Sequence, residues 1–178
     1  FVYYGEELGM TGAKPDERIR TPMAWSRSAP HAGFTTGTPW EPLALDSLEA
    51  NVEVQAGDAQ SLLTLQRTLI HLRAATPALG RGELVPLATD NAAVVAFLRR
   101  DPAGSVLVVA NLGAAPAAII RLASGSGLLP AGRYAPRTLY GATAPERVDV
   151  DAAGRVETTM ALPGHSGVVV ALHRVPGH

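Results

Sequence analysis

The chain has 178 residues, of which 47% are hydrophobic and 17% are charged. This length is typical of one domain, or of a small domain joined to part of another, and so apolar a composition excludes disorder along the whole chain. Fifteen Lys and Arg against sixteen Asp and Glu leave a formal net charge of -1, which argues against nucleic acid and acidic membranes as partners. The absence of Cys excludes disulfides, thiolate metal sites and a cysteine nucleophile. No apolar run approaches the roughly 18 residues that a membrane-spanning helix needs.

The first four residues predict a buried strand. Phe1, Val2, Tyr3 and Tyr4 are aromatic or β-branched and show no polar alternation, as in a strand that is packed on both faces. Phe1 is neither an initiator Met nor the basic start of a secretory signal, so we expect the chain to be a fragment. Its localisation, in a bacterial cytoplasm or secreted, stays open.

A long loop and a helix follow. Residues 5–57 are rich in Gly and Pro and lack a regular period, which in a compact domain is typical of a functional loop. Residues 58–75 predict a helix, with Asp58 as its cap and Pro77 just beyond its end. The apolar stripe of this helix consists of Leu62, Leu65, Leu69 and Leu72.

The rest of the chain consists of short β-rich runs separated by turn residues. Such runs predict an antiparallel sandwich. Its aromatic residues are only Phe97, Tyr134 and Tyr140, so it is expected to be a packing domain rather than a starch-binding one. The eight runs are 84–88, 92–98, 106–111, 117–122, 134–140, 147–150, 156–162 and 168–173.

Several short segments in the first half of the chain occur in a characteristic order. In sequence they are FVYYGEELGM at 1–10, PDERIRTPMAW at 15–25, AGF at 32–34, PW at 39–40, NV at 51–52, Gln55, Asp58, SLL at 61–63, LIHLR at 69–73 and PAL at 77–79. Together they resemble the carboxyl-terminal part of an α-amylase family glycoside hydrolase. The resemblance is closest to the α-glucosidase, oligo-1,6-glucosidase and neopullulanase-like members.

The resemblance implies a mixed fold. Residues 1–82 would be the end of a (β/α)8 catalytic barrel, comprising its last strand, a long loop and its last helix. Residues 83–178 would be the all-β antiparallel Greek-key sandwich called domain C. The complete protein from which this chain would come, here called the parent, would be a retaining α-glycosidase acting on α-glucosidic bonds of starch, malto-oligosaccharides or related α-glucosides. The alternative is a non-catalytic β-sandwich that packs or assembles proteins.

Asp16 and Arg20 are the candidate substrate-binding residues. Their spacing, followed by Thr-Pro-Met-x-Trp, is similar to a family segment that holds hydroxyls of the second glucose on the non-reducing side of the cleavage point. The chemistry suits this role, because a carboxylate accepts hydrogen bonds and a guanidinium donates them in a fixed fork. The alternative is an ordinary ion pair within the loop, and Arg18 is near enough in sequence to replace Arg20 as the partner.

Three further residues are candidates for loop support. The resemblance implies that Glu7 braces the site without touching sugar, and a solvated loop residue is the alternative. Trp25 and Trp40 are expected to anchor the loop to the barrel, with stacking on a sugar ring as the alternative.

No catalytic residue is expected in this chain. Retaining glycosidases need two carboxylates about 5 to 5.5 Å apart. The resemblance implies that these carboxylates lie upstream of Phe1, so the fragment alone should be inactive. Glu6 and Glu7 are adjacent carboxylates, but neighbours at a strand end point to different sides.

No metal or cofactor is expected from this chain either. The five His residues, His31, His71, His165, His173 and His178, lack the short spacing of ligands on one face. Family members often bind calcium through a domain inserted earlier in the chain, so calcium remains an option for the parent only. The expected partners are an α-glucan or α-glucoside, the missing part of the barrel and, for the fragment, a second copy of itself.

Overall fold

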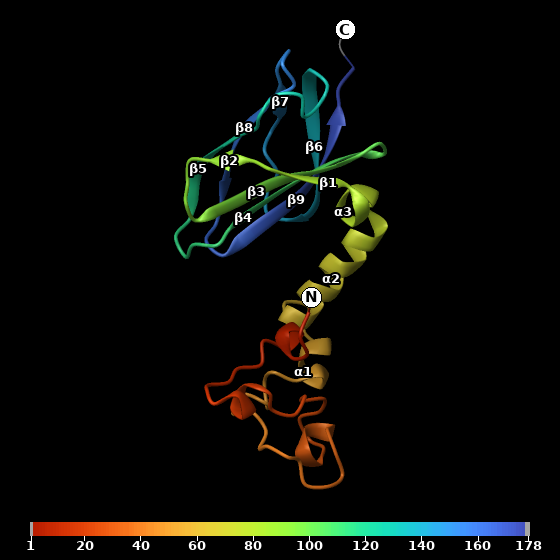
Figure 1. The fold of residues 1–178 in the computed structure, drawn as a ribbon, viewed down its shortest axis with the longest axis vertical. Helices are drawn as coiled ribbons and strands as arrows, with labels where there is room; N and C mark the ends of the chain where they lie inside the picture. The colour runs from red at the N-terminus through yellow and green to blue at the C-terminus, as the bar shows by residue number, and fades with distance from the viewer. Residues whose placement is uncertain (1, 177–178) are drawn as a thin grey trace. The chain divides into compact units, whose positions relative to one another are not determined.

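The computed structural model describes residues 2–176 and divides into two compact units (Figure 1). The amino-terminal unit is Phe1–His71 and the sheet unit is Leu72–His178. The division falls inside helix α2 (Leu62–Ala75). Among the described residues, no helix is both long enough and apolar enough to cross a membrane.

The amino-terminal unit is mostly loop, as the sequence predicts for residues 5–57. A small core of Leu8, Met23 and Ala50 holds the loop together, and Leu63 at the start of α2 packs against it. The short helix α1, which the sequence did not predict, lies at the end of the loop. The regular elements before α2 are the 3-10 turns η1 (Glu6–Leu8), η2 (Asp16–Ile19) and η3 (Pro30–Gly33), and helix α1 (Val52–Ala56).

The prediction of a buried strand at the start of the chain is wrong for residues 2–4, and Phe1 lies outside the described residues. Val2, Tyr3 and Tyr4 form no strand, and their side chains are exposed. A strand is stabilised by hydrogen bonds to a neighbour, and the sheet of this structure begins only at Glu83 and pairs with none of these residues. An apolar segment alone therefore stays unpaired here.

Helix α2 confirms the predicted helix but begins later than expected. Its cap is Ser61, whose Oγ accepts a hydrogen bond from the Thr64 N–H at 3.2 Å. Asp58 instead accepts from the Gln60 N–H at 2.8 Å, inside the preceding turn. None of the α2 side chains is buried, and Ile70 is 58% exposed. In the predicted apolar stripe, Leu62 and Leu69 are exposed, whereas Leu72 packs against the cluster of Ala78, Leu79, Val106 and Val169.

The sheet unit contains a short helix and nine strands. Each of the eight predicted β-rich runs overlaps a strand, and the first run is divided between two strands. Leu87, between them, still donates its N–H to the Ala96 carbonyl at 2.9 Å. The elements are α3 (Pro77–Arg81), β1 (Glu83–Pro86), β2 (Ala88–Thr89), β3 (Val94–Asp101), β4 (Gly104–Asn111), β5 (Ala117–Ala123), β6 (Gly132–Gly141), β7 (Val148–Val150), β8 (Val156–Leu162) and β9 (Ser166–Arg174).

All nine strands belong to one antiparallel sheet with the order β1-β3-β4-β9-β6-β7-β8-β5-β2. The two edge strands are consecutive in the chain, and the sheet curls into a barrel-like shape around its core (Figure 1). Burial alternates along β8, as expected for a strand with one face on the core. On the other face, α3 packs against the sheet through Ala78 and Leu79, which meet Val106 and Val169. The side chains of the main core with the smallest exposure include Leu98, Leu107, Ile120, Leu122, Leu162 and Val170.

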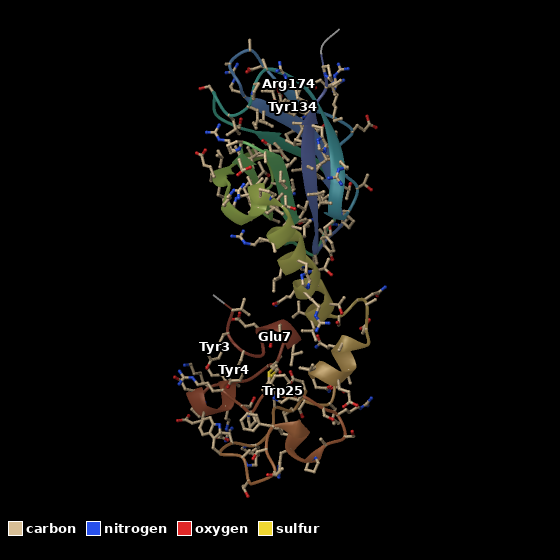
Figure 2. All side chains as sticks on the ribbon, turned by 90° about the vertical axis from the view of Figure 1, so that its right-hand side faces the viewer. Tyr3, Tyr4, Glu7, Trp25, Tyr134 and Arg174 are labelled. Carbon is tan, nitrogen blue, oxygen red and sulfur yellow. The ribbon has the colours of Figure 1, made fainter. Side chains whose placement is uncertain are left out.

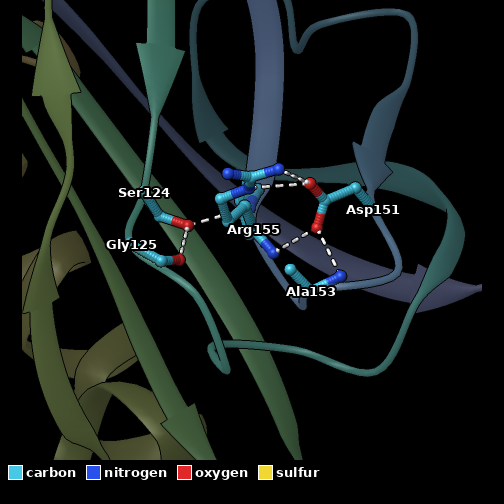
Figure 3. A network of polar contacts seen from close by, with 6 residues as sticks. Ser124, Gly125, Asp151, Ala153 and Arg155 are labelled. Atoms are coloured by element: carbon cyan, nitrogen blue, oxygen red, sulfur yellow. Dashed lines mark hydrogen bonds and ion pairs between the residues drawn. The ribbon is translucent and has the colours of Figure 1, made fainter.

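A turn joins β7 to β8 and is held by one carboxylate (Figure 3). Asp151 Oδ1 accepts from the N–H groups of Ala153 at 2.8 Å and Arg155 at 3.0 Å. Its Oδ2 accepts from Arg155 Nε at 2.7 Å. Beside the turn, Ser124 Oγ accepts from the Val156 N–H at 2.8 Å. The bond from the Arg155 N–H is the largest cause of a lowered pKa at Asp151, followed by the Arg155 side chain.

This turn predicts a pH-dependent loss of stability in Asp151→Asn. A carboxyl whose pKa is lower in the folded chain stabilises the fold above the unfolded pKa of about 3.9, and the stabilisation is lost as pH falls through the folded value. Asp151→Asn removes the charge and places an amide against Arg155. The melting temperature of this variant at pH 7 should therefore lie below that of the unaltered chain. The difference should shrink in melts below about pH 4. The exposed Glu146→Gln is the control, and a difference that does not change with pH would contradict this account.

Candidate functional site

The candidate site lies in the loop of the amino-terminal unit, around η2. Asp16 begins this turn and Arg20 follows it, so that Arg20 Nη2 lies 3.5 Å from Asp16 Oδ2. Lys14 Nζ bonds the other oxygen of Asp16. The Arg20 and Asp16 side chains are 56% and 49% exposed. The structure therefore brings the two predicted residues together, selects Arg20 over Arg18 as the partner, and leaves both groups facing solvent.

The segment after this pair is fixed by an aromatic side chain from the start of the chain. Tyr4 Oη donates to the carbonyl of Thr21 at 3.1 Å, and Thr21 is buried. Partial burial of the phenol, followed by the effect of neighbouring Tyr3, raises the pKa of Tyr4. Tyr4 therefore remains a neutral donor at physiological pH. It holds the backbone directly after Arg20.

Glu7, labelled in Figure 2, lies in η1. Its Oε2 is buried and has no hydrogen-bond partner among the described residues. A hollow of about 470 Å³ adjoins it, and Tyr3, Tyr4 and Ile70 are among the residues that line this hollow. A buried carboxylate oxygen without a donor is costly. Glu7 thus lines the hollow while one of its carboxylate oxygens is enclosed without a donor among the described residues.

Gln55 fixes the position of η1. Its Nε2 donates to the Leu8 carbonyl at 2.7 Å, and its Oε1 accepts from the Leu63 N–H at 3.0 Å. One side-chain amide thereby joins the end of η1 to the first turn of α2. In the sequence, Gln55 was only one of the residues that carry the family resemblance. The two hydrogen bonds show what this side chain does in the structure.

The two tryptophans do not anchor the loop within the described residues. Trp25 is 51% exposed and Trp40 is 63% exposed. The expected anchoring therefore requires a surface other than these residues. The backbone of Trp25 is nevertheless fixed, because its N–H donates to Ala32 at 2.8 Å and its carbonyl accepts from the Glu53 N–H at 3.1 Å.

Glu53 and Asn51, on and before α1, are functional supports that the sequence reasoning missed. Glu53 Oε2 accepts from Ser26 Oγ at 2.6 Å and from the Arg27 N–H at 2.8 Å. The bond from Ser26 is the largest cause of the lowered pKa of Glu53. Asn51 is fully buried and caps α1 by accepting from the Val54 N–H at 2.9 Å. An Asn directly before a helical segment is a signal for such a cap, whereas nothing local signals the bonds of Glu53.

The described residues hold no group of three or more His, Cys, Asp or Glu arranged to bind a metal ion. His178, one of the five histidines considered above, lies outside them.

Comparison with known proteins gives the context of this loop. A family model described as the α-amylase catalytic domain matches residues 1–82. The match covers somewhat less than half of the chain, so the similarity to the α-amylase family is shown for residues 1–82. This confirms the resemblance seen in the segments from FVYYGEELGM onward.

Among curated relatives of this chain, a probable α-glucosidase of Rhizobium meliloti is 32% identical over 130 residues, covering 62% of this chain and 23% of the relative. A probable oligo-1,6-glucosidase 2 of Bacillus subtilis is 34% identical over 148 residues, covering 62% of this chain and 26% of the relative. A trehalose synthase of Thermus thermophilus is 38% identical over 124 residues, covering 62% and 13%. The chain thus spans about a quarter or less of these relatives.

Solved structures match over nearly the whole chain. The trehalulose synthase of Pseudomonas mesoacidophila matches with 31% identity and a TM-score of 0.64, covering 88% of this chain and 26% of that one. A trehalulose synthase variant in complex with its substrate sucrose matches with 27% identity and a TM-score of 0.72, covering 97% and 35%. By name, these relatives are glucosidases and trehalose or trehalulose synthases.

Proposed function

We propose that this chain is the carboxyl-terminal part of a retaining α-glycosidase that acts on α-glucosidic bonds of starch, malto-oligosaccharides or related α-glucosides. The observation that carries the proposal is the α-amylase match over residues 1–82, which includes the loop that holds Asp16 and Arg20 together. The names of the relatives, and the sucrose bound to one of them, support an α-glucoside as the substrate class.

We further propose the domain assignment that the resemblance implies. Residues 1–82 would end the (β/α)8 catalytic barrel, and residues 83–178 would form the Greek-key sandwich, domain C. The family match stops at residue 82 and β1 begins at Glu83, which supports this boundary. The spatial order β9-β6-β7-β8, in which the last strand returns to lie beside the first, is that of a Greek key.

In this proposal, Asp16 and Arg20 bind hydroxyl groups of a glucose that is not the one being cleaved. Each side chain uses only part of its hydrogen-bonding capacity on the other, at 3.5 Å, and both reach solvent. A carboxylate with free lone pairs beside a guanidinium with free N–H groups suits neighbouring sugar hydroxyls, which both donate and accept. Glu7, Trp25 and Trp40 support the loop against the rest of the barrel.

The remaining part of the barrel is the proposed partner for the uncovered face of the amino-terminal unit. Tyr3, Tyr4 and Ile70 line the hollow beside Glu7 and are exposed here. Apolar residues gathered around an unsatisfied carboxylate oxygen indicate a surface that is covered in the complete enzyme. The cover would supply a donor to Glu7.

The test compares two substrates in an enzyme that carries this chain together with its catalytic carboxylates. Asp16→Ala or Arg20→Ala should lower kcat/KM for maltotriose, because hydrogen bonds that persist in the transition state are lost. The corresponding loss of transition-state stabilisation should be on the order of 1 to 3 kcal/mol. The loss should be smaller for nitrophenyl α-glucoside, whose single glucose does not reach the second glucose position.

Arg18→Ala is the matched control, because Arg18 is a neighbouring arginine of η2 while Asp16 is paired with Arg20. It should leave the ratio of the two kcat/KM values unchanged. Equal losses on both substrates for Asp16→Ala and Arg20→Ala would show that the pair is structural and would overturn the proposed sugar role.

A further inference from the structure

We propose that Gly12, held in place by Thr11 and Asp46, is a positioning residue for the Asp16–Arg20 pair. This inference rests on the proposed sugar role of the pair. It concerns residues to which the sequence assigned no function. It explains how an exposed pair in a long loop keeps a defined geometry.

The first step is the close approach of Gly12 to η2. A Cβ atom at residue 12 would lie 2.4 Å from the Arg18 carbonyl oxygen and 2.9 Å from Ile19 Cα. Both are backbone atoms of the turn that begins at Asp16 and ends directly before Arg20, so no side-chain rotation relieves the contact. The φ angle of Gly12 lies outside the left-handed region, so alanine is compatible with its backbone. Space alone therefore requires glycine here.

The second step is the attachment of this glycine to the rest of the loop. The preceding residue, Thr11, donates to Asp46 Oδ2 twice, from its N–H at 2.8 Å and from its Oγ1 at 2.7 Å. The Asp46 carbonyl in turn accepts from the Ala50 N–H at 2.7 Å, and Ala50 is buried. Gly12 is thus tied through Thr11 and Asp46 to the segment that leads into α1. A backbone fixed in this way limits, by steric contact, the positions that η2 can adopt.

The third step is the narrow tolerance of the pair. Arg20 Nη2 and Asp16 Oδ2 are already 3.5 Å apart, near the limit of a hydrogen bond. Moving the Arg18 carbonyl from 2.4 Å to an ordinary contact distance from a new Cβ requires a shift of roughly one ångström or more. Misplacement of substrate-positioning groups by about 1 Å can lower rates by about 100-fold. Gly12→Ala should therefore act on sugar binding without touching sugar.

The experiment begins with the 178-residue chain and compares Gly12→Ala with Gly37→Ala. Gly37 is a matched control in the same loop, because the nearest atom to its added Cβ would be Thr35 Oγ1 at 3.8 Å. Backbone amide NMR shifts should move across residues 16–20 in Gly12→Ala and stay in place in Gly37→Ala. Thr11→Val, which removes the Oγ1 donor, should move the same amides, and Thr11→Ser, which retains it, should not. Unmoved amides in Gly12→Ala would overturn the inference.

The second readout is a double-mutant cycle in the complete enzyme. Gly12→Ala should lower kcat/KM for maltotriose about 10-fold or more relative to nitrophenyl α-glucoside, and should add little when Asp16 is already Ala, because both changes act on one pair. Equal losses on both substrates, or losses that add fully to those of Asp16→Ala, would overturn the positioning role. The proposed function is tested separately by Asp16→Ala alone. It fails if this variant loses kcat/KM equally on maltotriose and on nitrophenyl α-glucoside.

Discussion

The 178-residue chain by itself is expected to hydrolyse neither nitrophenyl α-glucoside nor maltotriose above a buffer control. Retention requires a nucleophile and an acid on either side of the scissile bond, about 5 to 5.5 Å apart. Glu6 and Glu7 are the tempting pair, but they are consecutive in η1 and differ in environment. Glu6 Oε2 accepts from the Tyr3 N–H at 3.2 Å on the surface, whereas Glu7 Oε2 is buried and unpaired. If the catalytic carboxylates lie in the rest of the enzyme, as proposed, this chain lacks the rate enhancement of on the order of a million-fold or more that enzymes provide.

The assay needs a control for contaminating glycosidase. Glu6→Gln and Glu7→Gln, purified in the same way, should give the same background as the unaltered chain. Turnover that survives purification and disappears in either variant would place a catalytic group in η1. It would overturn the proposal that the catalytic carboxylates lie in the rest of the enzyme.

The strands and the long helix were accessible from the sequence because their signals are periodic. In β8, residues 156–162 alternate between buried and exposed positions, as the sequence predicts. In α2, the apolar residues recur at helical spacing even though none of them is buried in this structure. The period is therefore visible in the sequence whether or not the side chains are buried, and among the described residues only Leu63 and Leu72 of α2 pack against a core cluster.

Other features were inaccessible because they depend on partners or on contacts distant in sequence. Residues 2–4 have the composition of a strand, yet strand formation needs a neighbour, and none of the strands among residues 2–176 pairs with them. The bonds from Glu53 to the Ser26–Arg27 segment span 26 or 27 residues, and the Gln55–Leu8 bond spans 47. Such single polar bridges leave no local pattern in a sequence.

The candidate site likewise has some features that could be predicted from the sequence and others that could not. From the sequence, an ion pair of Asp16 was the alternative to a sugar site, with Arg18 or Arg20 as its partner, and the structure places Arg20 in contact with Asp16. The close approach of Gly12 to the Arg18 carbonyl involves backbone atoms only, so no residue type except glycine itself hints at it. A glycine in a loop has many possible reasons, and only coordinates distinguish close approach from conformational freedom.

The full chain is expected to self-associate, whereas residues 72–178 should fold alone and remain monomeric. The sheet unit has its own core and retains α3, whose Ala78 and Leu79 cover Val106 and Val169. The amino-terminal unit instead exposes Tyr3, Tyr4 and Ile70 around the hollow beside Glu7. Apolar surface of this kind in a small unit favours a second copy as a substitute cover. Light scattering across a concentration series, with circular dichroism to confirm folding, measures both expectations.

A matched variant separates this surface from other causes of association. Ile70→Gln in the full chain keeps α2 helical, because Gln is a good helix former, and removes one apolar side chain from the lining of the hollow. It should shift the equilibrium toward monomer. Leu84→Gln, in the sheet unit, replaces another exposed apolar residue and should leave association unchanged. If the full chain is monomeric and residues 2–71 are protected from hydrogen exchange, the amino-terminal unit is complete without a cover, and its assignment as the end of a barrel fails.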